Sequence, residues 1–179
     1  MNIDWNQINH EAGGIDGLGN ELPLGMQDGG RVIELILGED NIRSAVECWA
    51  DRLHGAFAAQ AFLRIARSRL AMEHCYQIYK ANPNSSRANR AVYLLSEIAE
   101  SEALPMMAEI INDPDFNHRW HCVIAMEQIL SGPIDDEEIE IAKAILSKGE
   151  SDTSPRLRER AAEIRERLKN NPRLDYLNL

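Results

Sequence analysis

Three stretches of the chain repeat one helical pattern, and this repeat most constrains what the chain folds into. A shift of 31 residues superposes the first stretch on the second, and a further shift of 39 superposes the second on the third. The matched residues are Ala91, Leu94 and Ile98, then Cys122, Ala125 and Ile129, then Ala161, Ile164 and Leu168. Small residues let neighbouring helices approach, and larger apolar residues fill the layer between them. The pattern therefore predicts helices that pack on their own repeats.

Stacking follows from the same pattern, because a single pair of helices cannot bury its apolar stripe alone. From residue 29 onward, apolar residues recur at helical spacing, and short turns such as Asn82-Pro83, Asp113-Pro114-Asp115 and Gly132-Pro133 separate the segments. The sequence shows no alternating apolar and polar run typical of a strand. It predicts an all-α fold of stacked helical hairpins, with an irregular helical bundle as the alternative.

The glycines divide the chain into segments. Eight of the 11 glycines lie before residue 39. Residues 1–28 therefore predict an irregular N-terminal arm that packs on the body, with a helical turn near Asp4–His10. Residues 29–170 are expected to form the helical repeat domain, and residues 171–179 a C-terminal tail.

Charge and cysteine content restrict the partners and the compartment. The chain has 29 acidic and 19 basic residues, a formal net charge of -10, which disfavours nucleic acid and attracts a cationic protein. The N-terminal residues lack a secretory signal pattern, and no apolar run is long enough to cross a bilayer, so we expect no membrane partner. The three cysteines are widely spaced and predict no disulfide framework, which favours a cytoplasmic location.

One cluster has the residue types of a metal site. His118, His121 and Cys122 are spaced so that they can share a helix face. Cys122, however, falls on the repeated core position, and no fourth ligand has a useful spacing. We therefore expect a core cysteine with surface histidines, and no metal or other cofactor. The same interpretation applies to His74 and Cys75.

Other charged and reactive groups also have structural explanations. Asp135–Glu138 fall in the first turn of an expected helix, where carboxylates oppose the positive end of the helix dipole. Basic residues of the last helix alternate with glutamates and predict a solvated terminal cap. Neither a Gly-x-Ser-x-Gly nor a His-Glu-x-x-His pattern occurs, and the chain is predicted not to be an enzyme.

A protein-binding surface is expected on the second helix of each pair, at positions opposite the buried stripe. These positions, called the strip below, are Asn89, Tyr93, Glu97, Trp120, Ile124, Glu127, Glu159 and Glu163. Aromatic rings supply contact area that loses its water on binding, and carboxylates supply orientation and association rate. In the alternative interpretation, Tyr93 and Trp120 pack under the N-terminal arm. Trp49 is expected in the core.

Several of these segments resemble the HEAT repeat family. The resemblance lies in the turn Asn112-Asp113-Pro114-Asp115 with Arg119 after it, in Arg87 and Arg90, and in Pro155-Arg156-Leu157-Arg158. It covers residues 84–170 well and residues 29–82 loosely, and the chain departs from the family in its varying repeat length and in the Ala-rich stretch 55–67. The resemblance implies a right-handed α-α superhelix of HEAT-like hairpins.

The N-terminal segment adds a second resemblance. Residues 5–13, followed by Leu22-Pro23 and a helix, look like the start of small bacterial HEAT-like proteins, many of which are similar to immunity proteins of polymorphic toxin systems. This implies that the chain neutralises a cognate toxin by occluding its active site or substrate groove. One alternative is a scaffold or maturation factor of the chromophore-lyase-subunit type, with a small-molecule pocket between helices. The other is a HEAT-like DNA-repair glycosylase, which the charge opposes.

Overall fold

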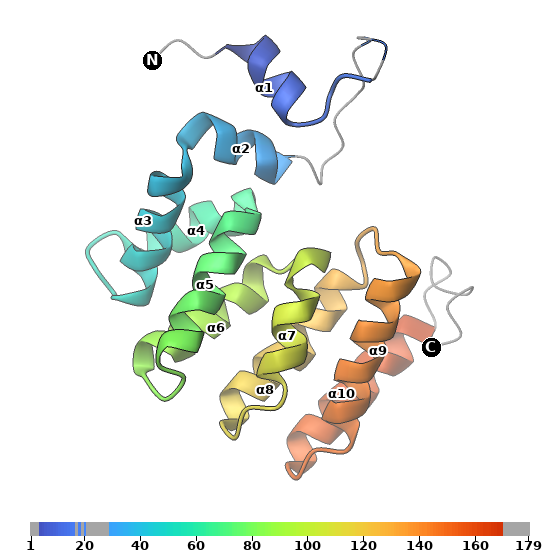
Figure 1. Cartoon of the computed structure of the whole chain (residues 1–179). Coiled ribbons are helices and arrows are strands. Elements are labelled where there is room, and N and C mark those ends of the chain that lie inside the picture. The colour runs from blue at the N-terminus through green and yellow to red at the C-terminus, as the bar shows by residue number, and fades with distance from the viewer. Residues whose placement is uncertain (1–3, 17, 19, 21–28, 170–179) are drawn as a thin grey trace.

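The computed structural model describes residues 4–16, 18, 20 and 29–169, and the body of the chain is helical (Figure 1). The α-helices are α1 (Trp5–Glu11), α2 (Gly29–Leu37), α3 (Glu39–Ala50), α4 (Ala56–Ala66), α5 (Arg69–Ala81), α6 (Ser86–Ile98), α7 (Leu104–Ile110), α8 (Phe116–Ile129), α9 (Asp136–Glu150) and α10 (Pro155–Lys169). A short 3-10 helix, η2 (Ser101–Ala103), precedes α7. The described ranges contain no β-strand, so the predicted all-α class is confirmed.

The helices of the body pack as consecutive pairs in two layers. α3 packs on α4, α5 on α6, α7 on α8, and α9 on α10. Figure 1 shows α5, α7 and α9 side by side in front, with their paired helices behind them. In the rear layer α4 contacts α6, α6 contacts α8, and α8 contacts α10. The rear layer therefore carries the residues of the strip, which come from α6, α8 and α10.

Side-chain caps fix where several of these helices begin. The side chains of Ser68, Ser85 and Asp115 accept hydrogen bonds from backbone N–H groups in the first turns of α5, α6 and α8. Asp135 caps α9 with the reciprocal contact from Glu138, which forms a complete capping box. These caps set the first residues of α5, α6 and α8, and the acidic run at the start of α9 stabilises that helix.

The repeated small residues lie in the core. Ala91, Cys122 and Ala161 are each 0% exposed, as the superposed sequence patterns predicted. Gly149 of α9 packs so closely that an added Cβ would lie 2.8 Å from Val123 Cγ2 and 2.9 Å from Ala161 Cβ. Small residues therefore set the close approach of α8, α9 and α10, and the core extends without a break through the stacked pairs.

His118 is not on the surface, so the prediction of surface histidines is wrong at this position. Its side chain is fully buried, with Nδ1 3.3 Å from Asp113 Oδ1 and the ring edge-on to Tyr79. Neither ring nitrogen has a partner in hydrogen-bond geometry. The physical reason is the repeat itself, since a shift of 39 residues places His118 on Leu157, which is also buried.

A buried carboxylate joins the N-terminal helices to the body. Glu34 of α2 is 5% exposed and accepts hydrogen bonds from Ser68 Oγ at 2.6 Å and from the Leu70 backbone N–H at 2.9 Å. The negative charge of this carboxylate lies at the positive N-terminal end of the α5 dipole and stabilises the helix. Before α2, the short helix α1 begins at its cap Asp4 and contacts α2. Residues 1–3, 17, 19 and 21–28 of the expected arm and the expected tail, residues 171–179, lie outside the described residues.

Candidate protein-binding surface

The strip residues lie along three neighbouring helices of the rear layer. Tyr93, Trp120 and Ile124 are partly exposed, whereas Glu159 and Glu163 of α10 are exposed. Because α6 contacts α8 and α8 contacts α10, side chains from separate hairpins border one another. The strip nevertheless forms two aromatic groups and one charged group rather than a single row of equivalent contacts.

Tyr93 belongs to a row of aromatic rings that crosses three helix pairs, from Trp49 on α3 through Tyr93 on α6 to His121 on α8. Its ring centroid lies 5.9 Å from that of Trp49 and 5.3 Å from that of His121, which meets it edge-on. Trp49 packs against the core, as expected, and donates from Nε1 to the Arg90 carbonyl at 3.0 Å. Burial and a hydrogen bond with Glu97 raise the pKa of Tyr93, so its hydroxyl is neutral near pH 7.

The Trp120 ring lies in a separate aromatic group on α8 and α10. Its centroid is 5.9 Å from that of Phe116, and the Arg156 guanidinium carbon lies 4.6 Å above it. This is a cation–π contact that reaches from one hairpin to the next. The ring neighbours of both Tyr93 and Trp120 thus come from helices of the body, not from the described part of the N-terminal arm.

The strip carboxylates are mostly ion-paired within the chain. Glu97 accepts a hydrogen bond from Gln60 at 2.7 Å and lies 3.7 Å from Arg64. Glu127 accepts from Arg160 at 3.0 Å and from Arg167 at 2.5 Å. The strip therefore carries the positive charge of these arginines as well as the negative charge that the sequence predicted.

The same arginines connect α8 with α10. Arg160 also pairs with Glu163 at 3.1 Å, so Glu127 and Glu163 share this guanidinium. Glu159, one turn away on the exposed side of α10, makes no ion pair among the described residues. The structure thus brings Glu127 and Glu163 together, with arginines that the sequence interpretation had assigned to a solvated cap.

Among the described residues, Ile124 and Asn89 make no hydrogen bond, ion pair or ring contact with another strip side chain. Ile124 is partly exposed on α8. Asn89 Oδ1 on α6 is buried and has no hydrogen-bond partner. The side chain of Ile124 therefore adds partly exposed apolar surface to the strip, while the side-chain carbonyl of Asn89 is an unsatisfied acceptor close to the start of α6.

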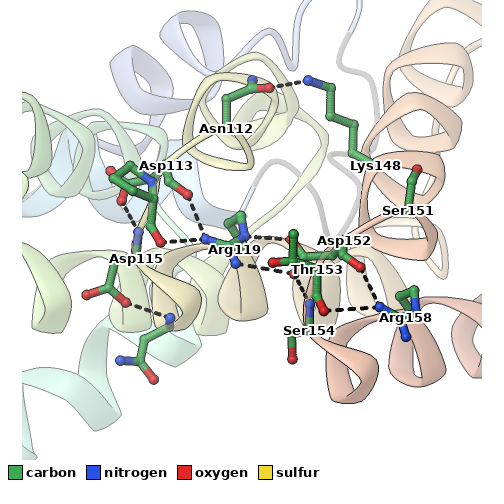
Figure 2. Close-up of polar contacts among 12 residues, drawn as sticks. Asn112, Asp113, Asp115, Arg119, Lys148, Ser151, Asp152, Thr153, Ser154 and Arg158 are labelled. Atoms are coloured by element: carbon green, nitrogen blue, oxygen red, sulfur yellow. Dashed lines mark hydrogen bonds and ion pairs between the residues drawn. The ribbon is translucent and has the colours of Figure 1, made fainter.

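A network of hydrogen bonds at the helix turns fixes the relative placement of α8, α9 and α10 (Figure 2). Arg119 donates from Nε and Nη2 to the Asp152 carboxylate, at 2.6 and 3.2 Å, and from Nη1 to the carbonyls of Asp113 and Pro114. A guanidinium held by four such contacts is rigid, and a bidentate pair with a carboxylate is among the strong side-chain interactions. The hydrogen bond to Arg119 lowers the pKa of Asp152.

The next repeat has part of the same arrangement. Arg158, 39 residues after Arg119, donates from Nη1 to the carbonyls of Asp152 and Thr153, at 2.8 and 3.1 Å. Figure 2 shows the two arginines on either side of the turn at residues 152–154. Lys148 also contacts Asn112 across this gap. The sequence indicated the arginines as a repeated feature, but the partner Asp152 lies in the following hairpin, which a local pattern does not reveal.

A cavity of about 620 Å³ opens between these turns, lined in part by Asn112, Arg119, Lys148 and Asp152. These four polar side chains are already hydrogen-bonded in two pairs, Lys148 with Asn112 and Arg119 with Asp152. Within the described residues, no group of three or more His, Cys, Asp or Glu side chains is arranged to hold a metal ion. None of the helices in that part of the chain is long and apolar enough to cross a membrane.

No protein-family model, curated protein or solved structure matches this chain.

Proposed function

We propose that this chain is a protein-binding module with a HEAT-like, right-handed superhelical build, and that it neutralises a cationic protein toxin by covering its active site or substrate groove. It acts by binding alone, without catalysis. The observation that carries the proposal is the strip, which presents two partly exposed aromatic groups and arginine–glutamate pairs on three adjoining helices. Tryptophan, tyrosine and arginine are the residues that most often dominate binding energy in interfaces.

Electrostatics supports a cationic partner. The net charge of -10 attracts a positive protein over long range and raises its association rate. At the strip, the carboxylates of Glu127 and Glu163 are held in place by Arg160 and leave oxygen lone pairs for a lysine or arginine of the partner. Pre-positioned side chains lose less conformational entropy on binding than free ones.

Purification of the tagged full-length chain from its source cells tests the proposal. We expect a stoichiometric partner of basic composition that dissociates at high salt, because screening weakens the electrostatic contribution. The partner alone should arrest growth when expressed in a heterologous host, and co-expression of the chain should restore growth. An acidic partner, or a basic one whose toxicity the chain leaves unchanged, contradicts the proposal.

A titration with duplex DNA separates the glycosylase alternative. At low salt, we expect no change in the anisotropy of a labelled duplex, since the net negative charge repels the phosphate backbone. Saturable binding at micromolar protein, lost on addition of salt, supports the DNA-repair alternative instead.

A further inference from the structure

His121 of α8 lies among the strip residues, although the sequence assigned it no role in the strip. It follows Trp120 directly and precedes Ile124 by less than one helical turn. Its ring meets that of Tyr93 on α6 edge-on, with the ring centroids 5.3 Å apart, and its side chain is partly exposed. A protein bound along the strip therefore comes within reach of His121.

A hydrogen bond to α6 fixes which ring nitrogen of His121 carries the hydrogen. Ser96 Oγ donates its only hydrogen to the Tyr93 backbone carbonyl, at 2.7 Å. His121 Nδ1 lies 3.4 Å from the same Ser96 oxygen, which can then only accept, so Nδ1 is the donor. A neutral imidazole has one N–H group, and assignment from this network therefore leaves Nε2 with a lone pair.

The other ring nitrogen of His121, Nε2, has no hydrogen-bond partner among the described residues. It is nevertheless not buried, in contrast to both ring nitrogens of His118, which are buried and unpaired. An accessible nitrogen with an unused lone pair accepts one hydrogen bond from an N–H group of another molecule. His121 therefore presents a hydrogen-bond acceptor at the strip to any protein that binds there.

Protonation of His121 alters this outer nitrogen and leaves the inner contact in place. The Nδ1–H group still donates to Ser96 in the charged ring, while Nε2 gains a hydrogen and becomes a donor. An N–H group of a partner that faced the lone pair then faces another N–H group and a positive charge. The ring loses no internal hydrogen bond, but the strip no longer accepts the same hydrogen bond from a partner.

The surroundings of His121 favour its neutral form. Burial lowers the pKa of the imidazole from its ordinary 6.5, and His118 on the same helix lowers it further. Glu97 on α6 and Asp115 at the start of α8 act in the opposite direction without reversing the shift. Tyr93, whose ring touches the imidazole, has a raised pKa and is neutral in this range. His121 is therefore mainly neutral at pH 7 and takes up its proton below pH 6.5.

The other helices that contact α8 bring no further titrating group to this ring. On α10, Arg156 lies over the ring of Trp120, and Arg160 pairs with Glu127. The charged residue of α7, Glu109, pairs with a lysine of α5. α9 meets the buried side of α8 through its glycine. The side chain that faces a partner of the strip and changes charge between about pH 5 and pH 7 is therefore His121.

We propose that the neutral Nε2 of His121 accepts a hydrogen bond from a lysine or arginine side chain of the partner bound to the strip, and that protonation of His121 breaks this contact. The inference rests on the proposed function and adds to it a contact residue and a dependence on pH. Lysine and arginine are the donors that a basic partner supplies in excess. His121 thereby distinguishes a partner with a cationic donor at this place from one that has only an apolar group there.

Proton uptake and partner binding compete for the same lone pair, which gives the direction of the pH effect. Affinity is constant where the free chain is neutral at His121, and it falls up to tenfold for each pH unit below the pKa of the free chain. Calorimetry between about pH 7.5 and pH 5.0 measures this with the purified basic protein recovered with the tagged chain. We expect the parent complex to be about 3- to 10-fold weaker at the acid end. Glutamate side chains ordinarily titrate near pH 4.3, below this range.

Two substitutions separate the acceptor from the charge. His121→Gln places an amide oxygen at a similar reach and does not titrate, so we expect affinity within about threefold of the parent and no dependence on pH in this range. His121→Phe keeps a ring beside Tyr93 but has no acceptor, and we expect about 5- to 10-fold weaker binding at the neutral end. His10→Gln, on the exposed side of α1, is the matched control and should retain the pH dependence of the parent.

The hydrogen assignment is tested on the full chain without a partner. A two-bond proton–nitrogen NMR spectrum of the labelled protein distinguishes the two neutral forms, and the signals of His121 are identified by their loss in His121→Gln. We expect the Nδ1–H form above pH 7 and protonation below pH 6.5. The Nε2–H form would place a donor at the surface of the strip and overturns the proposal.

Failure of this inference is distinguishable from failure of the proposed function. If the basic protein binds and Trp120→Ala weakens it, but His121→Gln keeps the pH dependence of the parent, the strip remains the interface and the role of His121 is overturned. Parent-like affinity of His121→Phe at the neutral end overturns it as well. If no basic protein binds the chain, the proposed function fails and this inference fails with it.

Discussion

The guanidinium of Arg119 on α8 donates two hydrogen bonds to the carboxylate of Asp152, in the turn before α10, from Nε at 2.6 Å and from Nη2 at 3.2 Å. Their side chains are only 14% and 9% exposed. The pair joins two successive hairpins, and it holds α10 beside α8, where both contribute to the strip. Several expected outcomes depend on this contact and on the close packing beneath it.

Loss of the Arg119 side chain should destabilise the protein. Arg119→Ala leaves the largely buried carboxylate of Asp152 and two turn carbonyls without their donor, which costs about 1–3 kcal/mol of unfolding free energy. Lys80→Ala is the matched control, because the pair of Lys80 with Glu109 is exposed and solvent screening leaves it little effect on stability. Urea denaturation followed by circular dichroism measures both. Equal losses in the two variants would contradict a structural role for the Arg119 contact.

Stability should fall in acid through Asp152. Its pKa is lowered in the folded state, chiefly by the hydrogen bond from Arg119. A lowered folded-state pKa contributes stability that is fully present above the unfolded value, about 3.9, and is lost as pH falls through the folded value. Thermal melts between about pH 6 and pH 2.5 should therefore show a shallower acid decline in Asp152→Asn than in the parent. Parallel declines would show that Asp152 is not responsible.

Gly149 should not tolerate a methyl group. Gly149→Ala raises helix propensity by about 1 kcal/mol, but its Cβ would meet Val123 Cγ2 and Ala161 Cβ within 3 Å. Overpacking of this kind costs about 1–3 kcal/mol, so we expect a net loss of stability. The exposed Ala144→Gly on the same helix gives the propensity effect alone. A more stable Gly149→Ala would mean that α8, α9 and α10 are further apart than described.

Thiol reactivity should distinguish the three cysteines. Cys75 and Cys122 are fully buried, and burial raises the pKa of both thiols, whereas Cys48 is partly exposed. In the native protein, we expect Ellman's reagent to titrate one thiol rapidly, and all three in denaturant. Cys48→Ser should remove the rapid reaction. A second rapid thiol in the native state would place Cys75 or Cys122 outside the core.

Trp120 should contribute strongly to partner binding. Trp120→Ala removes a partly exposed ring that is held between Phe116 and Arg156, and we expect about a 10- to 100-fold weaker complex with the partner isolated from cells. Trp5→Ala on α1, where the ring is 61% exposed, is the matched control. Isothermal calorimetry measures both affinities, and urea denaturation checks that each variant is folded. Equal affinities would remove Trp120 from the interface.

The sequence predicted the fold class and much of the core because the repeat carries that information locally. Ala91, Cys122 and Ala161 lie where superposed patterns placed them, and the caps at residues 85 and 115 follow ordinary helix-start chemistry. The same offset would have placed His118 in the core, since it matches Leu157. The interpretation of His118 as a surface residue gave its polarity more weight than its place in the repeat.

The strip shows what a local pattern leaves out. The sequence placed Glu127 on the strip, but it did not predict that two arginines from the next hairpin, Arg160 and Arg167, pair with it. Such contacts depend on how one hairpin is rotated and shifted against another. The helical period gives the face on which a residue lies and not its neighbour across the layer. The helical period likewise does not predict the buried contact of Glu34 on α2 with the first turn of α5.

The central claim is that the rear-layer helices bind a protein partner through the strip. Photo-activatable benzoyl-phenylalanine at Ile124, in the middle of α8, tests it most directly, with the exposed position Ala144 on α9 as control. The strip predicts a cross-link from residue 124 to a basic protein, absent at residue 144 and suppressed by Trp120→Ala in the same chain. A cross-link at residue 144 and none at residue 124 would contradict it.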